Sequence, residues 1–354
     1  MDLAILVAAF VLILAGAELF TNGIEWVGHK LQLAEGAVGS VLAAVGTALP
    51  ETMIPIIAIL VAQGDSNNEI GIGAILGAPF MLSTLAMFVS GVAVLAVARR
   101  RALGETMLVQ PVVLFHDVRW FYIGYAIAIG AAFLPADLVW PRWAIGAGLL
   151  VLYALYVREH FRAESDPGGG ADALAPLRLH RLDARTRVAD GSPRLRIVGL
   201  QVAVALGFII AGALVFVGAV EGLAGDLGVS VAILALIIAP IATELPEKFN
   251  SVIWIRQSKD TLAMGNITGA MVFQSMVPTV VALFFAPAMW SVSAAAPIVF
   301  ASAGIAFLST AAIFVPMRVR GVLRGRWLLV GGAFYVVYLA CVLLGIGTAG
   351  VAAG

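Results

Sequence analysis

The sequence predicts an all-α integral membrane protein of ten transmembrane helices, arranged as two inverted five-helix repeats. Three observations predict this fold: an apolar composition, a series of apolar stretches of membrane-spanning length, and a similarity between the two halves. Hydrophobic residues fill 62% of the 354 positions and charged residues 12%, against about 45–50% and about 25% in soluble domains. Water cannot solvate most of such a surface, so we expect the lipid bilayer to surround the chain.

The apolar stretches each reach or exceed the length of about 20 residues that a helix needs to cross a bilayer. They cover residues 3–28, 36–62, 70–98, 112–134, 141–161, 195–222, 229–255, 261–287, 295–316 and 326–347. The start of the fourth is the most polar, because it holds His116, Asp117 and Arg119. The first is counted as a span and not as a signal peptide, since Met1-Asp2-Leu3 carries no basic region.

Basic residues gather in every second loop between these stretches. They are Lys30, Arg99 to Arg101, the arginines between Arg158 and Arg196, Arg256 with Lys259, and the arginines between Arg318 and Arg326. Loops rich in lysine and arginine stay on the cytoplasmic side of a membrane. We therefore expect a multi-pass protein of the plasma or inner membrane, with both termini outside.

The two halves align with one another. Placing Gly16 on Gly212 without a gap also places the sequence GTALPE, which ends at Glu51, on ATELPE, which ends at Glu247. After a short deletion, the segment GAILGA at 73–78 aligns with GNITGA at 265–270. An odd number of spans in each half inverts the second half in the membrane. The predicted units are a first repeat at 1–161, a flexible cytoplasmic linker at 162–194 and a second repeat at 195–354.

Four charged residues fall deep inside apolar stretches: Glu51, Glu244, Glu247 and Lys248. An ionised residue at the centre of a membrane costs about 2.5–3.5 kcal/mol, so a function is the default explanation. Glu244 and Lys248 also have the helical spacing of an ion pair, and in a first interpretation they neutralise each other. In a second interpretation, the ammonium group of Lys248 takes the place of a bound cation.

Proline precedes each of the two symmetric glutamates. Pro50 and Pro246 have no amide hydrogen, so the carbonyls of Gly46 and Ala242 lose their helix partners. We expect unwound backbone here, which survives at membrane depth where it lines a cavity. The two glutamates, the hydroxyls of Thr47 and Thr243 and these carbonyls offer the oxygen ligands that Ca²⁺ prefers.

The two LPE segments, each followed by a Gly-x-Ile-x-Gly helix, resemble the paired alpha repeats of the sodium/calcium exchanger superfamily. The resemblance covers about 36–83 and 229–275. It implies an antiporter with its ion site between the second, third, seventh and eighth helices, and alternating access by sliding of the first and sixth. It further implies that Glu51 and Glu247 are the essential carboxylates, with ligands from Thr47, Thr243, Gly46 and Ala242.

The sequence departs from this family pattern at several ligand positions. They are Ala48 and Glu244 in place of serine after each threonine, Ala78 and Ala270 in place of the next serine, and Leu82 and Gln274 in place of Asn or Asp. Glu244 and Gln274 remain candidate ion ligands. The loss of oxygen atoms favours coupling to protons, or to fewer sodium ions, and argues against full sodium coupling.

The expected function is exchange of Ca²⁺, or a similar cation, for Na⁺ or H⁺. A monovalent sodium/proton exchanger and a non-transporting ion-binding protein of the same fold remain alternatives. An enzyme is not expected, because no HExxH or GxSxG motif is present. The transported ions are substrates, and no cofactor is expected. The partners are the bilayer and small cations, with no nucleic acid, and the chain is expected to act as a monomer.

The remaining polar residues have less specific interpretations. Glu18 and Asn22 lie one helical turn apart on the first stretch, where they either line an ion path or make interhelical contacts. His29, His116, His160 and His180 fall in or near loops and are interpreted as titrating surface groups. Cys341 is the single cysteine, so no internal disulfide can form.

Overall fold

The computed structural model describes residues 2–30, 49–62, 65–163, 176–179, 193–293 and 297–346. This part of the chain is almost entirely helical. Its strands are β1 (Thr106–Met107) and β2 (Leu323–Arg324), which pair antiparallel in a two-stranded ribbon. The all-α prediction is confirmed.

The helices follow the apolar stretches closely. In the first half they are α1 (Asp2–Lys30), α3 (Leu49–Ile56), α4 (Asp65–Met81), α5 (Met87–Val97), α6 (Pro111–Gly130) and α7 (Val139–Ala163), with short helical segments η2 (Ile57–Ala62), η3 (Leu82–Ala86), η4 (Ala98–Arg100) and η5 (Ala131–Phe133). In the second half they are α8 (Leu195–Leu227), α9 (Val231–Arg256), α10 (Asp260–Phe285), α11 (Pro297–Arg320), α12 (Gly325–Leu328) and α13 (Val330–Leu343). Several ends follow from local chemistry: α6 begins with a proline, and α8 ends at Gly228 with φ of 62°.

Among the described residues, seven helices are long and apolar enough to cross a membrane. Two shorter apolar helices, Ala4–Phe20 and Glu51–Ala62, add to them. The chain is thus a multi-pass membrane protein by length and composition of its helices. The described helices overlap each of the ten stretches expected from the sequence, and the total of ten spans remains a prediction.

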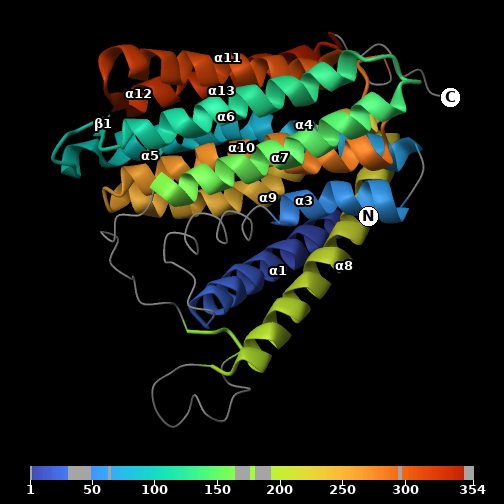
Figure 1. The fold of residues 1–354 in the computed structure, drawn as a ribbon, viewed down its shortest axis with the longest axis horizontal. Coiled ribbons are helices and arrows are strands. Elements are labelled where there is room, and N and C mark those ends of the chain that lie inside the picture. The colour runs from blue at the N-terminus through green and yellow to red at the C-terminus, as the bar shows by residue number, and fades with distance from the viewer. Residues whose placement is uncertain are drawn as a thin grey trace.

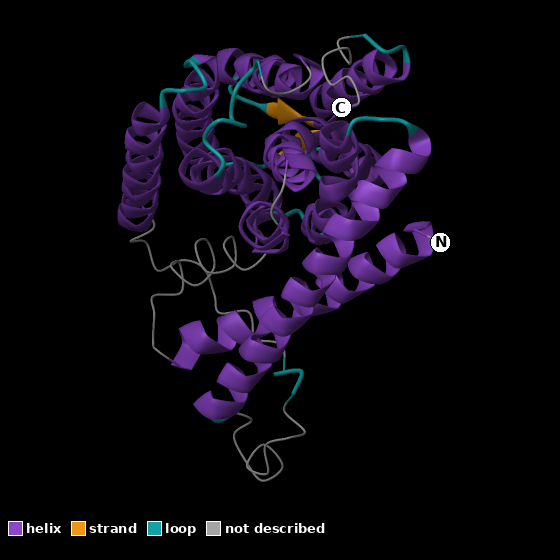
Figure 2. Cartoon of the chain, turned by 90° about the vertical axis from the view of Figure 1, so that its right-hand side faces the viewer, coloured by secondary structure: helices purple, strands orange, loops and turns teal. Residues whose placement is uncertain are grey.

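The helices form two groups in space. Figure 1 shows α1 and α8 side by side, running obliquely away from the stacked helices of the remaining bundle, and Figure 2 shows the same pair from another side. The large apolar cluster of the bundle joins α4 to α7 with α9, α10, α11 and α13. A second cluster, which includes Ile13, Ile54, Phe216 and Ala235, packs the α1/α8 pair against α3, η2, α4 and α9.

The seam between α1 and α8 is reciprocal. A Cβ atom added at Gly16 would lie 2.8 Å from Cγ1 of Ile209. A Cβ atom added at Gly212 would lie 2.7 Å from Cγ1 of Ile13. Glycine is required at both places because the facing helix is too close for a side chain. Gly16 and Gly212 are the two residues that the repeat alignment pairs, and so are Ile13 and Ile209.

A buried ion pair closes one end of the bundle. Nη1 of Arg101 donates to Oδ1 of Asp260 at 2.9 Å and to the carbonyl of Ile255 at 2.8 Å, and the amide of Leu108 donates to Oδ2 of Asp260 at 2.7 Å. Both side chains of the pair are buried. The pair fastens the loop between α5 and α6 to the turn between α9 and α10. The basic triplet at 99–101 therefore includes a residue with a structural role as well as surface charges.

Candidate ion-binding site

Glu51 lies in the first turn of α3 and is 6% exposed. Its helix packs against α4, α8, α9 and α10. The helices α3, α4, α9 and α10 all contact one another, and they come from the second, third, seventh and eighth apolar stretches. Glu51 is thus a buried carboxyl group within the helix set that the family resemblance implied for the ion site.

Gln274 faces the interior of the same bundle. It lies on α10 and is buried, as is its neighbour Ser275. Ser83 on η3 is buried as well, and the repeat alignment pairs it with Ser275. The hydroxyl of Ser83 donates to the carbonyl of Phe80 at 3.0 Å, and that of Ser275 donates to the carbonyl of Val272 at 2.9 Å. The two repeats therefore hold the same serine with the same backbone hydrogen bond.

The backbone is irregular near these residues. Glu51 is followed by the π-helical segment η2, and the glycine motif of α4 is followed by the π-helical segment η3. Single π-helical turns inside longer helices often mark functional sites. At the corresponding place in the second half, α10 contains Pro278, which offers no amide hydrogen to the carbonyl of Gln274. Both glycine-motif helices thus depart from regular hydrogen bonding just after the motif.

The unwinding expected at Ala242 does not occur, because α9 runs as one helix from Val231 to Arg256 through Pro246. A proline removes a single hydrogen bond and introduces local crowding, and α9 packs against α4 and α10. The expectation of unwound backbone in this half was wrong.

Several predicted site residues lie outside the described part of the structure. Gly46 and Thr47 belong to the undescribed segment 31–48. Ala242, Thr243, Glu244, Glu247 and Lys248 lie on the backbone of α9, but their side chains are not described. Their roles as ligands, and the pairing of Glu244 with Lys248, therefore stay predictions. Among the described side chains, no group of three or more His, Cys, Asp or Glu residues could hold a metal ion.

Asn22 holds a segment of the linker between the two halves. Its side-chain oxygen accepts hydrogen bonds from the Gln201 side chain at 3.0 Å and from the amide of Arg178 at 3.0 Å, and its nitrogen donates to the carbonyl of Pro176 at 3.5 Å. Gln201 in turn accepts from the amide of Leu179 at 2.9 Å. Asn22 thus makes contacts between helices and with the linker, and its role in an ion path stays a prediction.

The same segment is fixed by an apolar contact and a surface ion pair. Leu177 is buried in a small cluster with Trp26 and Val198, and Nη2 of Arg178 lies 2.8 Å from the exposed carboxylate of Glu18. The linker expected to be flexible therefore contains a docked element, residues 176–179. Gln201 was not among the predicted site residues, although a glutamine in an apolar helix is itself a signal of a polar contact.

Both the sequence and the fold of this chain are similar to those of known proteins. The family model described as "Sodium/calcium exchanger protein" matches residues 1–158 and 198–347. The crystal structure of an H⁺/Ca²⁺ exchanger, CAX, is similar with a TM-score of 0.73 and 13% identity, covering 97% of this chain and 82% of that one. The sodium-calcium exchanger NCX_Mj, soaked with Na⁺ and Sr²⁺, is similar with a TM-score of 0.53 and 16% identity, covering 96% and 97%. A search of curated protein sequences gave no match.

Proposed function

Because this chain belongs to the sodium/calcium exchanger family, we propose that it exchanges Ca²⁺ or a similar cation for H⁺ or Na⁺ by alternating access across the membrane. The family and fold are those of cation antiporters. The observation that locates the proposed ion site is the burial of the Glu51 carboxyl group, on a helix that contacts α4, α9 and α10. Ionisable residues inside a membrane bundle mark ion pathways by default.

The proposed architecture is ten spans in two inverted repeats, and the α1/α8 seam supports it. Gly16 on α1 faces Ile209 on α8, and Gly23 faces Val202. Residue numbers thus decrease along α8 where they increase along α1, so the two helices run antiparallel. Two equivalent helices that run antiparallel and make reciprocal contacts are related by a two-fold axis perpendicular to the helices. Such an axis in the membrane plane is the symmetry of inverted-repeat transporters, which bind their substrate near the midplane between repeats.

The proposed ligands are Glu51 and Glu247, with oxygen atoms from Thr47, Thr243, Gly46, Ala242, Glu244 and Gln274. Ca²⁺ takes six to eight oxygen ligands, and the glutamates of two antiparallel repeats would approach one ion from opposite directions. Lys248 is proposed to pair with Glu244, which leaves Glu51 and Glu247 to balance the charge of a divalent ion. In the alternative, the ammonium group of Lys248 takes the place of a bound cation in the site. Transport by Lys248→Leu would then acquire a new dependence on monovalent ions.

Protons are the proposed coupling ion. Ala78 and Leu82 are buried and apolar at positions where the family resemblance leads us to expect oxygen ligands. Fewer oxygen atoms leave fewer sites for sodium, whereas carboxylates can still exchange a metal for protons. The solved structure named as an H⁺/Ca²⁺ exchanger has the same fold over 97% of this chain, so proton coupling requires no different architecture.

Alternating access is proposed to use the α1/α8 pair as the moving part. This pair has its own apolar contacts along the seam, such as Phe20 with Ala205 and Ile209, and it meets the bundle through a separate cluster. A boundary between two internally packed units is where sliding costs the fewest contacts. The rest of the bundle, which carries Glu51 and Gln274, would stay fixed.

The test is uptake of ⁴⁵Ca²⁺ into proteoliposomes under imposed proton and sodium gradients in turn, with Glu51→Gln as the inactive control. We expect a proton gradient to drive uptake and a sodium gradient to drive little. Uptake driven only by sodium would reverse the coupling assignment. Absence of Ca²⁺ uptake, with sodium/proton exchange present, would favour the monovalent alternative, and binding without flux would favour a non-transporting protein.

The inverted-repeat topology has its own test. Cysteines at Ser66 and Gly191, with Cys341 replaced, should label from opposite sides of the membrane.

A further inference from the structure

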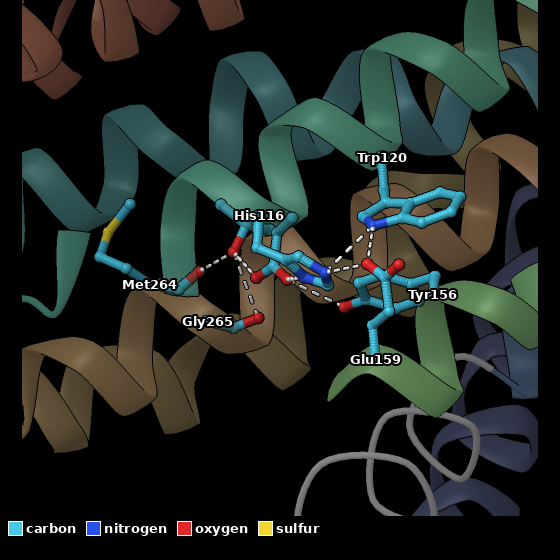
Figure 3. A network of polar contacts seen from close by, with 8 residues as sticks. His116, Trp120, Tyr156, Glu159, Met264 and Gly265 are labelled. Carbon is cyan, nitrogen blue, oxygen red and sulfur yellow. Dashed lines mark hydrogen bonds and ion pairs between the residues drawn. The ribbon is translucent and has the colours of Figure 1, made fainter. Parts of the chain in front are cut away.

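A second polar network lies between three helices, apart from the helix that carries Glu51. Figure 3 labels His116 and Trp120, which come from α6, and Tyr156 and Glu159, which come from α7. Asp117 on α6 and Thr268 on α10 complete the network. Helix α6 begins at Pro111, after the loop that holds Arg99 to Arg101, and the amide of Gln110 donates to the hydroxyl of Thr261, next to Asp260, at 3.0 Å. The start of α6 therefore lies at the end of the bundle that the Arg101–Asp260 pair closes. This end is called the basic face below.

The inner end of the network is a buried carboxylate. Asp117 is 1% exposed and accepts hydrogen bonds from the hydroxyl of Tyr156 at 3.0 Å and from that of Thr268 at 2.6 Å. The Thr268 hydroxyl is also 3.1 Å from the carbonyl of Met264 and 3.5 Å from that of Gly265. Its shortest contact is with Asp117, so this carboxylate joins α6 directly to α10.

Thr268 connects the network to the candidate ion site. It is part of the glycine motif of α10, and a rise of 1.5 Å per residue puts it roughly 9 Å along the helix from Gln274. In the first repeat the matching residue is Leu76, which has no hydroxyl. The link therefore joins the first repeat to the motif helix of the second, and the motif helix of the first repeat has no hydroxyl at the matching position for a symmetric counterpart.

The outer end of the network lies at the surface of the helix bundle. Nε2 of His116 lies 3.0 Å from Oε2 of Glu159, and Nδ1 lies 4.0 Å from Oδ1 of Asp117. The side chain of His116 is 25% exposed and that of Glu159 is 53% exposed. The indole nitrogen of Trp120 lies 3.1 Å from Nε2 of His116 and 3.2 Å from Oε2 of Glu159. The ring is thus partly exposed and stands between two carboxyl groups.

The donor and acceptor properties of these groups make the proton on Nε2 decisive. An indole nitrogen can only donate and an ionised carboxylate can only accept. With a proton on Nε2, His116 donates to Glu159, and Trp120 donates to the same carboxylate. The neutral ring keeps one hydrogen, and with that hydrogen on Nδ1, which faces Oδ1 of Asp117 at 4.0 Å, Nε2 accepts from Trp120 and opposes the Glu159 oxygen with a lone pair. Glu159 is half exposed and then turns to water, which removes one tie between α6 and α7.

We propose that His116 is a proton-binding site on the basic face, and that the bound proton slows transport by holding α6, α7 and α10 together. The proposal rests on the antiport function proposed above, since it names a regulation of that activity. Among the described residues, the charged and titratable groups that face or adjoin the ring are Asp117 and Arg119 on α6, Tyr156 and Glu159 on α7, and Arg318 of α11, which lies over the ring of Phe115 at 5.5 Å.

Histidine is the side chain suited to this role, since its charge can change between pH 5 and 8. The sequence pattern led to His116 being interpreted as a surface group near a loop. The structure instead places its ring stacked on Tyr156, with centroids 5.6 Å apart, and next to a buried carboxylate. The network joins the consecutive helices α6 and α7 to α10, which is distant in the sequence, so no local pattern could indicate it.

The transport test uses ⁴⁵Ca²⁺/⁴⁰Ca²⁺ self-exchange at saturating Ca²⁺, with the pH varied on one side of the membrane at a time. Saturation removes simple competition between protons and Ca²⁺ at the ion site, so the remaining pH effect is on the maximal rate. In the parent, acidification of the basic face from pH 8 to pH 5.5 should slow exchange severalfold. His116→Asn and Glu159→Gln should both keep the fast rate at either pH, while His160→Asn, the matched histidine control, should behave like the parent.

A second measurement needs no transport. A protonated imidazole quenches a neighbouring indole, so fluorescence of the parent should fall on acidification. This change should be absent in both His116→Asn and Trp120→Phe. An unchanged pH profile of the maximal rate in His116→Asn would overturn the proposal, as would quenching that persists in His116→Asn. If no variant and no parent transports but the quenching follows His116, the proposed antiport function fails while proton binding stands.

Discussion

The side-chain amide of Gln201 donates to the side-chain oxygen of Asn22 at 3.0 Å, inside the seam between α8 and α1. The same glutamine accepts from the amide of Leu179 and donates to the carbonyl of Leu19 at 2.8 Å. A single buried side chain thus joins the two helices of the proposed moving pair and the linker element 176–179.

Gln201→Leu should lower the stability of the folded protein. The substitution keeps the size of the side chain but leaves buried polar partners without their hydrogen bonds, at a cost of about 1–3 kcal/mol. Thermal unfolding in detergent measures the loss. Glu18→Ala is the control, because it removes only an exposed ion pair with Arg178, and pairs of that kind contribute about 0–1 kcal/mol. Equal melting temperatures for Gln201→Leu and the parent would contradict the role of this residue.

Gly16→Ala and Gly212→Ala should have matching effects. Each new methyl group would meet the facing helix within 3.0 Å, and overpacking of this kind costs about 1–3 kcal/mol. Transport should slow in both variants, since the seam belongs to the moving pair. Gly218→Ala on α8 is the matched control, because nothing lies within 4 Å of a Cβ there and alanine favours a helix over glycine. A large effect at only one of the two positions would argue against a reciprocal seam.

Arg101→Ala should destabilise the bundle strongly, by about 3–5 kcal/mol, because it leaves the buried carboxylate of Asp260 without its cation. Arg99→Ala removes an exposed arginine from the same triplet and should change little. Replacing Arg101 and Asp260 together by leucine should cost less than the sum of the single changes. A double-mutant cycle of unfolding temperatures checks this, and additive costs would mean that the two residues act independently.

Glu51→Gln and Glu247→Gln should each abolish cation exchange while the protein still elutes as a folded species in detergent. An amide keeps the shape of the side chain but loses the charge that a cation requires. Glu105→Gln, in the loop between α5 and α6, is the control and should transport at the parental rate. Exchange at that rate in either site variant would remove that glutamate from the proposed site.

The sequence was sufficient for the helices and insufficient for the contacts between them. Apolar length alone located α6, α8 and α11 to within a few residues, because the bilayer leaves the backbone little choice but a helix. The placement of Glu51 among α3, α4, α9 and α10 agrees with what the resemblance of the two LPE segments to the exchanger family implied. By contrast, the contact of Asp117 with Thr268 joins helices separated by most of a repeat, and the docking of Leu177 beside Trp26 depends on how α1 and α8 cross.

The reciprocal seam also bears on how such a chain can arise. Ala9, Ile13 and Gly16 face Ala205, Ile209 and Gly212, and the residues at each aligned pair are identical. Gly16 would therefore meet the same atoms if the facing helix were a second copy of α1 inserted in the opposite direction. The surface is self-complementary in the way of a two-fold symmetric dimer. An ancestral half-length chain with dual orientation would already have had this interface, and fusion of two copies would have required only a connecting segment.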